Sequence, residues 1–213
     1  MTVGRSDGRT VGRVLRIAFV GCILSVGPTV RQSDCQDTIP AGYGSLRRDD
    51  IVVRFSTSAI EVQVLPLDEQ VIRLLAPDTY RSLHQLIKSR YADIAEAASR
   101  AATDQATLFM VTYLGVVPQA RFNPEDLNIT SRGRSVRPVG IVPLSPTWSS
   151  FQLDAREQAA AIYLFDPGIS LREEMVVSYQ GQSSGSWNNS IRRLDQERAR
   201  VKARAQGGAS PGP

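Results

Sequence analysis

The stretch TLFMVTYLGVV at residues 107–117 decides the fold class of this chain. In the helical segment just before it, apolar residues recur every three or four positions, and from residue 106 onward they recur every two, which is the period of a β-strand. Clusters of turn-forming residues at 131–134 and 166–168 separate further short strands. These strands are predicted at 127–130, 136–144, 151–153, 159–165 and 175–179. Short strands without regular helix alternation favour an antiparallel β-sandwich over a parallel α/β sheet.

The chain before this stretch predicts two strands followed by a helical insertion. Residues 51–55 and 60–64 are rich in β-branched side chains and predict strands that each turn one face toward a core. Asp68 can cap a short helix, and Pro77 can open a longer one. The longer helix carries one apolar stripe, made of Tyr80, Leu83, Ile87, Tyr91, Ile94 and Ala98. We therefore expect a helical hairpin at residues 67–104, inserted into a sandwich that spans residues 51–180.

The segments on either side of the sandwich have a different composition. Residues 31–50 are rich in Gly, Asp, Ser and Arg and predict a linker. Residues 181–206 predict a second linker followed by a basic helix, whose apolar stripe is thin and contains Ile191, Leu194 and Val201. A charge run of this kind most simply forms a solvated helix, although it could also lie on anionic lipid or a partner. Residues 207–213 predict a disordered tail.

The positive charge of the chain lies at its two ends. The net charge is +4, and residues 1–30 carry +3 while residues 191–204 carry +4, which leaves about −3 for the rest. A surface that binds phosphates needs a surplus of Lys and Arg on the folded domain. We therefore expect no nucleic-acid partner.

Residues 1–30 predict an export signal or a membrane anchor. Four arginines precede the uncharged run at residues 17–30, which holds 14 residues and is shorter than the roughly 20 apolar residues that a spanning helix needs. Arginine outnumbers lysine 23 to 2, which is typical of a GC-rich bacterial genome. We expect export to the periplasm, outer membrane or cell surface, with anchoring in the inner membrane as the alternative.

The sequence FVGC at residues 19–22 resembles the lipobox of bacterial lipoproteins, in which the cysteine receives lipid and becomes the mature N-terminus. This resemblance makes Cys22 a candidate for lipidation and attachment to a membrane. Removal of the segment at another site, or its retention as an anchor, stays open. If Cys22 is removed or modified, Cys35 has no partner for an internal disulfide.

The sequence FQLDAREQAAAIYLF at residues 151–165 combines a polar turn, Asp154-x-x-Glu157, with an apolar strand that ends in Phe165. In this pattern residues 106–180 resemble the immunoglobulin-like domains of uncharacterised bacterial envelope and secreted proteins. The resemblance implies an immunoglobulin-like antiparallel β-sandwich. The chain lacks the Cys-Trp-Cys pattern of true immunoglobulin domains.

Three groups of residues could carry catalysis. Ser183 lies in a G-x-S-x-G sequence at residues 181–185, which matches the nucleophile elbow of hydrolases, but His84, the single histidine, precedes it instead of following it. His84 lies at the border of an apolar helix stripe, where a packing role is the simpler interpretation. Dispersed carboxylates such as Asp126 with Glu173 could also act together. One histidine and two cysteines do not form an ordinary zinc site, so we expect no metal and no cofactor.

Trp148 and Trp187 are the strongest candidates for contact with a partner, because aromatic residues near loops often anchor carbohydrates or proteins. The simpler interpretation is that both pack at the ends of the sandwich. We expect a non-catalytic envelope protein that binds a protein or glycan partner. Two alternatives stay open: an exported hydrolase that uses dispersed carboxylates or Ser183, and a carrier of lipid or another small molecule.

Overall fold

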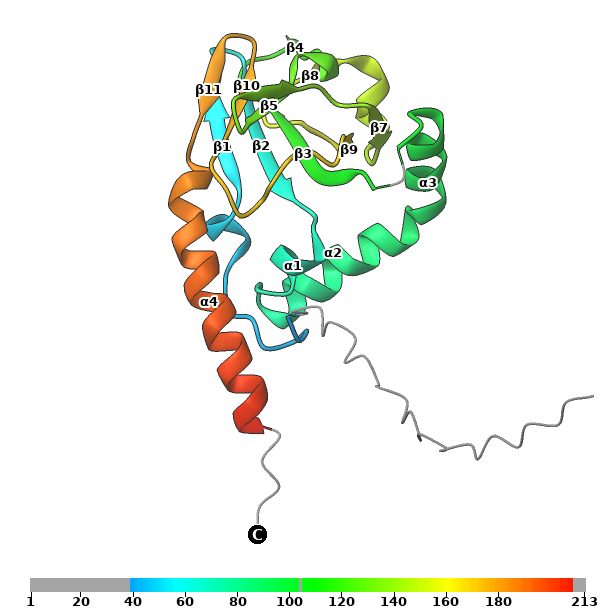
Figure 1. Cartoon of the computed structure of the whole chain (residues 1–213). Coiled ribbons are helices and arrows are strands. Elements are labelled where there is room, and N and C mark those ends of the chain that lie inside the picture. Colours follow the sequence, from blue (N-terminus) through cyan, green and yellow to red (C-terminus); the bar gives the residue numbers. More distant parts are fainter. Residues whose placement is uncertain (1–38, 104, 209–213) are drawn as a thin grey trace, which may run out of the picture. The chain divides into compact units, whose positions relative to one another are not determined.

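The computed structural model describes residues 39–103 and 105–208. The export or anchor segment with Cys22, the first part of the expected linker and residues 209–213 lie outside the described residues. The described chain consists mainly of antiparallel β-sheets, with helices inserted between its second and third strands and a long helix near the C-terminus (Figure 1).

The largest sheet has five strands in the order β1-β2-β3-β9-β7, and every neighbouring pair is antiparallel. The predicted strand at 107–117 is confirmed as the central strand β3, where Val111 pairs with Val64 on one side and Ala161 on the other. The strands are β1 (Val53–Ser56), β2 (Ile60–Pro66), β3 (Thr107–Gly115), β9 (Gln158–Phe165) and β7 (Gly140–Pro143).

Two smaller sheets complete the β-structure. The second sheet has the order β11-β10-β5-β6, with β11 (Gln182–Ser184), β10 (Met175–Tyr179), β5 (Asn128–Ser131) and β6 (Arg134–Val136). The third pairs β4 (Ala120–Arg121) with β8 (Gln152–Leu153). Three short 3-10 helices are η1 (Arg48–Asp50), η2 (Pro124–Asp126) and η3 (Pro146–Ser150).

The segment at 136–144, which the pattern predicts as one strand, is divided between two sheets. β6 ends at Val136 in the second sheet, and β7 begins at Gly140 in the five-stranded sheet. Pro138 lies between them, and a proline has no N–H to donate to a strand neighbour. Both pieces are edge strands, the position in a sheet to which proline is largely confined.

The insertion between β2 and β3 contains three helices: α1 (Glu69–Ile72), α2 (Pro77–Ser89) and α3 (Tyr91–Arg100). Asp68 caps α1 by accepting a hydrogen bond from the Gln70 N–H at 2.8 Å. The apolar stripe predicted as one helix belongs to two, because the backbone leaves the helical conformation at Arg90 (φ −106°, ψ 10°). α3 packs on the edge strand β7 and on β9, and a Cβ added at Gly140 would lie 3.4 Å from the Ala97 Cβ, so the insertion covers part of one face at this end of the five-stranded sheet.

Residues 39–50 are packed against the folded domain, whereas the composition predicts a linker. The side chain of Ile39 is buried, and Leu46 forms a parallel bridge with Leu75. The Leu46 N–H donates to the Leu74 carbonyl at 3.1 Å. A Cβ added at Gly44 would lie 2.3 Å from the Leu74 carbonyl carbon, so glycine is required at this close approach.

Helix α4 (Trp187–Gly208) begins earlier than the predicted helix and is anchored to the same N-terminal segment. Trp187, Leu194 and Val201 are fully buried along one face of the helix. Glu197 lies on this face with only 1% of its surface exposed. Its carboxylate accepts hydrogen bonds from the Ser45 N–H at 3.0 Å, the Ser45 hydroxyl at 2.8 Å and Arg204 at 2.9 Å. The helix is therefore part of the domain instead of a solvated extension.

Burial acts to raise the pKa of Glu197, but the hydrogen bonds from Ser45 and Arg204 outweigh it and hold the pKa below its ordinary value of 4.5. A depressed pKa in the folded state means that the charged carboxylate stabilises the fold above pH 4.5. This stabilisation is lost as the pH falls through the folded-state pKa.

We predict that Glu197→Gln lowers the free energy of unfolding at pH 7 by about 1–3 kcal/mol, because charge-assisted hydrogen bonds are lost at a buried site. The difference from the wild type should shrink as the pH falls below 4.5, where Glu197 of the unfolded chain binds a proton, and should vanish once the pH is below the lowered folded-state pKa. Urea unfolding of both proteins at a series of pH values measures this difference in the free energy of unfolding. Asp195→Asn is the matched control, because Asp195 is exposed and pairs only with Arg198 in its own helix. A difference that stays constant down to pH 3 would show that the charge of Glu197 is not its cause.

Candidate functional site

An aromatic cluster joins the five-stranded sheet to the second sheet. The ring of Tyr113 on β3 stacks on Phe122 at a centroid distance of 4.8 Å and lies 5.4 Å from Tyr179 on β10. Trp148 of η3 packs edge-on against Phe122 at 5.3 Å and against Tyr163 of β9 at 6.1 Å. Contacts at these centroid distances are favourable for aromatic pairs. The cluster therefore holds both sheets and the η3 segment in one core.

Hydrogen bonds from the tyrosine hydroxyls fix the position of the segment around η2. The Tyr163 hydroxyl donates to the Pro124 carbonyl at 3.0 Å, because a carbonyl can only accept. With its single proton used, Tyr163 accepts from the Tyr113 hydroxyl at 2.9 Å. The Tyr179 hydroxyl accepts from the Asn123 N–H at 3.0 Å. Strands from both sheets thus hold the two consecutive residues Asn123 and Pro124.

Burial raises the pKa of Tyr113, Tyr163 and Tyr179 above the ordinary value of 10.0. Removal from water penalises the charged phenolate in each case, and this effect is the largest cause. The three hydroxyls therefore keep their protons at neutral pH, and the direction of their hydrogen bonds stays fixed. They are structural groups that support the pocket described next.

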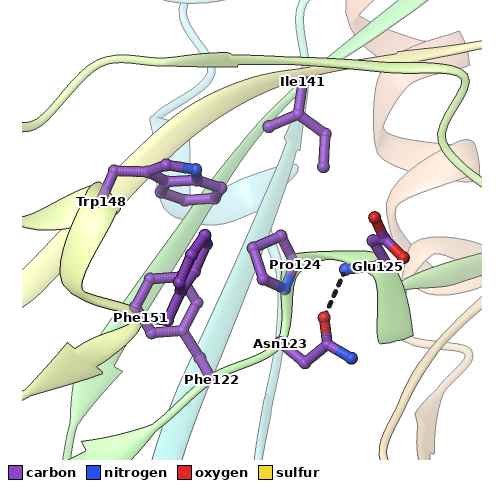
Figure 2. Close-up of a pocket in the computed structure, with 7 residues that line it drawn as sticks. All are labelled: Phe122, Asn123, Pro124, Glu125, Ile141, Trp148 and Phe151. Carbon is purple, nitrogen blue, oxygen red and sulfur yellow. Dashed lines mark hydrogen bonds between the residues drawn. The ribbon is translucent and has the colours of Figure 1, made fainter.

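A pocket of about 310 Å³ opens beside this cluster. Figure 2 shows Trp148, Phe122 and Phe151 on one side of the pocket, with Ile141 on the other. Pro124 lies between them, and Asn123 and Glu125 add polar groups. The lining is thus mostly aromatic and aliphatic with a few polar atoms, which is the usual composition of a binding site. We call it the Trp148 pocket.

Phe151 has two unusual properties at the Trp148 pocket. Its ring is 48% exposed, although it touches Phe122 at a centroid distance of 5.9 Å. Its backbone is in the left-handed region, with φ 51° and ψ 21°, which is strained for a bulky residue. Flanking bonds hold it there, since the Phe151 N–H donates to the Trp148 carbonyl and its carbonyl accepts from the Phe122 N–H at 3.0 Å. Strain retained at an exposed aromatic residue points to a function for the ring.

The two polar side chains at the pocket differ: Asn123 is hydrogen-bonded within the protein, whereas Glu125 is exposed to solvent. Both ends of the Asn123 side chain are engaged, because its oxygen accepts from the Glu125 N–H at 3.2 Å and its amide donates to Asp126 at 2.8 Å. Glu125 is exposed at the pocket and also lines a neighbouring hollow together with Arg137. The Glu125 carboxylate is therefore the charged group that a bound partner would meet first.

The structure separates the two tryptophans. Trp148 lines the pocket with 6% of its surface exposed. Trp187 is fully buried at the start of α4, so it offers no surface to a partner. Its indole nitrogen has no hydrogen-bond partner within the described part of the chain. Of the two residues predicted to bind a partner, only Trp148 lies at a candidate site.

The Ser183 sequence forms a β-hairpin instead of a nucleophile elbow. Gln180 and Gly181 both have positive φ, 46° and 79°, and connect Tyr179 of β10 to Gln182 of β11 as a two-residue turn. Ser183 is an exposed residue of the antiparallel strand β11, in register with Ser178. A nucleophile elbow needs a strand-to-helix turn with the serine at its apex, and this position does not provide one.

His84 and the dispersed acids each have structural partners elsewhere. The His84 Nδ1 lies 2.5 Å from the Glu69 carboxylate, and its ring packs on Tyr80. Partial burial acts to raise the pKa of Glu69, but hydrogen bonds from Arg73 and His84 outweigh it, so the pKa is lowered. The carboxylates of the other two candidates are also occupied in separate places. Asp126 accepts from Asn123 and Gln180, and Glu173 pairs with Arg132.

Residues 39–103 and 105–208 lack two features that would indicate a membrane span or a metal centre. None of their helices combines the length and apolar character needed to cross a membrane. They also contain no group of three or more His, Cys, Asp and Glu side chains placed to hold a metal ion. Comparison of the chain with protein families, curated proteins and solved structures found no match.

Sequence reasoning missed most of the residues that line the Trp148 pocket. Phe122 and Ile141 are predicted only as parts of a loop and a strand, and Phe151 as the start of a strand. The available signal was the short spacing from Trp148 to Phe151 after a proline, which brings two aromatic residues to one turn. The left-handed conformation of Phe151 has no sequence signal, because glycine or asparagine would be the usual choice.

We predict that Tyr163→Phe lowers the free energy of unfolding by about 1–3 kcal/mol, more than Tyr113→Phe, which should cost about 1 kcal/mol. The first change leaves the Pro124 carbonyl without its donor and the Tyr113 hydroxyl without its acceptor. The second change keeps the bond from Tyr163 to Pro124 intact. Guanidinium unfolding followed by circular dichroism measures both. Equal losses in the two variants would contradict the assignment of Tyr163 as the donor to Pro124 and of Tyr113 as the donor to Tyr163.

Proposed function

We propose that this chain is a non-catalytic module that binds a protein or glycan partner through the Trp148 pocket. The single observation that carries this proposal is the half-exposed ring of Phe151, which is held in a strained conformation at the edge of an aromatic pocket. Exposed aromatic anchors beside apolar pockets are the usual centres of protein interfaces. Flat aromatic faces also stack on the apolar faces of sugars, so either class of partner suits the chemistry.

We further propose that the two larger sheets are the layers of an immunoglobulin-like sandwich and that the protein acts in the bacterial envelope. The contact of Tyr113 with Tyr179 between the sheets supports the first part. The basic and apolar pattern of residues 1–30, with the lipobox-like Cys22, supports the second. Export would place the Trp148 pocket where extracytoplasmic proteins and cell-wall glycans are present.

The two alternatives have less support. A hydrolase would need Ser183 or a carboxylate pair beside a second catalytic group, and the partners of His84, Asp126 and Glu173 described above are structural. A carrier would need an enclosed apolar cavity, whereas the Trp148 pocket has the exposed residues Phe151 and Glu125 in its lining. The binding module therefore remains the function that the geometry supports best.

The test uses the full-length chain with Trp187→Phe, which leaves Trp148 as the single tryptophan. A panel of peptides with aromatic or aliphatic side chains and a panel of bacterial cell-wall glycan fragments are titrated while Trp148 emission is recorded. We expect saturable binding by members of one panel. Absence of binding in both panels would overturn the proposed function.

We predict that Phe151→Asn weakens this binding at least tenfold while the free energy of unfolding stays within about 1 kcal/mol of the parent. Asparagine tolerates the left-handed conformation, so relief of strain offsets the lost contact with Phe122. The matched control is Val117→Asn, because Val117 is also exposed but does not line the pocket. Equal binding by Phe151→Asn and its parent would show that the ring of Phe151 does not contact the partner.

A further inference from the structure

A second pocket, of about 320 Å³, lies on the opposite face of the five-stranded sheet. Thr112 of β3 is in register with Gln63 of β2 and Ala160 of β9, so their side chains share one face of the sheet. Tyr113, the next residue of β3, turns to the other face and meets Tyr179. We call the second pocket the Arg48 pocket, after the charged residue in its lining.

Arg48 brings a positive charge to this pocket, and one nitrogen of its guanidinium group lacks a hydrogen-bond partner within the described chain. Its Nε is buried and has no acceptor among the residues that the structure describes. Burial lowers the pKa of Arg48, and the charge of Arg54 lowers it further. This Nε is closed to solvent, so a ligand would meet the part of Arg48 that lines the pocket, and a carboxylate is the partner whose geometry fits a guanidinium best.

The acidic residue next to Arg48 is already paired. Asp49 forms an ion pair with Arg54, and the pKa of Asp49 is lowered mainly by the hydrogen bond from Arg54. No acidic residue lines the Arg48 pocket. The nearest acid on this face of the sheet is Glu61, whose carboxylate accepts from the lining residue Gln63 at 2.9 Å, so Arg48 is the charged group of the pocket wall itself.

The remaining lining sets the character of the ligand. Gln63, Gln158 and Thr112 provide neutral hydrogen-bonding groups from three adjacent strands, and Thr112 is only 8% exposed. Met110 and Leu144 add apolar surface. This combination of one cation, neutral polar groups and an apolar wall suits a small acid with a hydrocarbon body.

We propose that the Arg48 pocket binds a small organic carboxylate whose acid group pairs with Arg48 and whose apolar body rests on Met110 and Leu144. This site differs in residues and chemistry from the Trp148 pocket and does not depend on the proposed function.

The experiment is calorimetric titration of the full-length chain with hexanoate, its neutral analogue hexanamide, and glucuronate. We expect saturable binding of hexanoate, binding of hexanamide at least tenfold weaker, and glucuronate weaker than hexanoate. Hexanamide binding as tightly as hexanoate would overturn the role of the charge. Glucuronate binding more tightly than hexanoate would overturn the apolar part of the ligand and identify an acidic sugar.

Variants assign the binding to this pocket. Arg48→Gln should weaken hexanoate binding at least tenfold, whereas Arg47→Gln, which removes the same charge from an exposed neighbour outside the lining, should leave it unchanged. Thr112→Val preserves packing and should weaken binding about threefold, which keeps the test decisive if Arg48→Gln fails to fold. Unchanged binding in both pocket variants, or equal losses in the two arginine variants, would overturn the proposal. Phe151→Asn should bind hexanoate as the wild type does, so this result is separate from that at the Trp148 pocket.

Discussion

The hydrogen bonds that the tyrosine hydroxyls make around Pro124 are the constraint on which the arrangement of the sheets depends. Tyr113 and Tyr163 come from the five-stranded sheet, and Tyr179 comes from the second sheet. The Tyr163 hydroxyl donates to the Pro124 carbonyl, the Tyr179 hydroxyl accepts from the Asn123 N–H, and the Tyr113 hydroxyl donates to Tyr163. Three neutral donors and acceptors in an aromatic core can each be satisfied in only one way, so they fix where η2 lies. Phenylalanine would fill the same space but would leave this backbone unpaired.

The same constraint shapes the Trp148 pocket. Pro124 and Asn123 form part of its lining, so the tyrosines of the core hold it in place from behind. Trp148 is held from the side by Tyr163 and Phe122, which leaves Phe151 as the aromatic residue with the most freedom at the pocket. A site built in this way has rigid walls and exposed contacts at Phe151 and Glu125. Such preorganisation reduces the entropy that binding costs.

The main strands and the helical insertion could be predicted because their signals are local. The period of two in β3 and the capping residue Asp68 both depend on neighbours within a few positions. The packing of residues 39–50 could not be predicted, since Leu46 bonds to Leu74 from a distant part of the chain. Glu197 counted as a solvated charge in the sequence, but Ser45 and Arg204 satisfy it in a buried position. The buried stripe of α4 is therefore wider than its apolar residues alone indicated.

Of the residues that line the Trp148 pocket, only Trp148 itself was predicted from the sequence as a binding residue. Trp148 stood out by its type, but the same reasoning also selected Trp187, which is buried. Ser183 matched a motif of five residues, and the positive φ of Gln180 shows that the matching segment begins with a hairpin turn. Motifs describe local order, whereas a site depends on which distant elements meet. Only the fold could place Phe151 beside Phe122.

The packing of α3 on β7 has a consequence for how the protein behaves at high concentration. An uncovered edge strand offers a row of unpaired N–H and C=O groups, which invites pairing with another molecule. α3 packs on β7 and β9 at one end of the five-stranded sheet, and β1, at the opposite edge, packs beside β11 (Figure 1). Both outer strands of the five-stranded sheet thus have other elements of the fold beside them, which narrows the approach of a strand from another molecule.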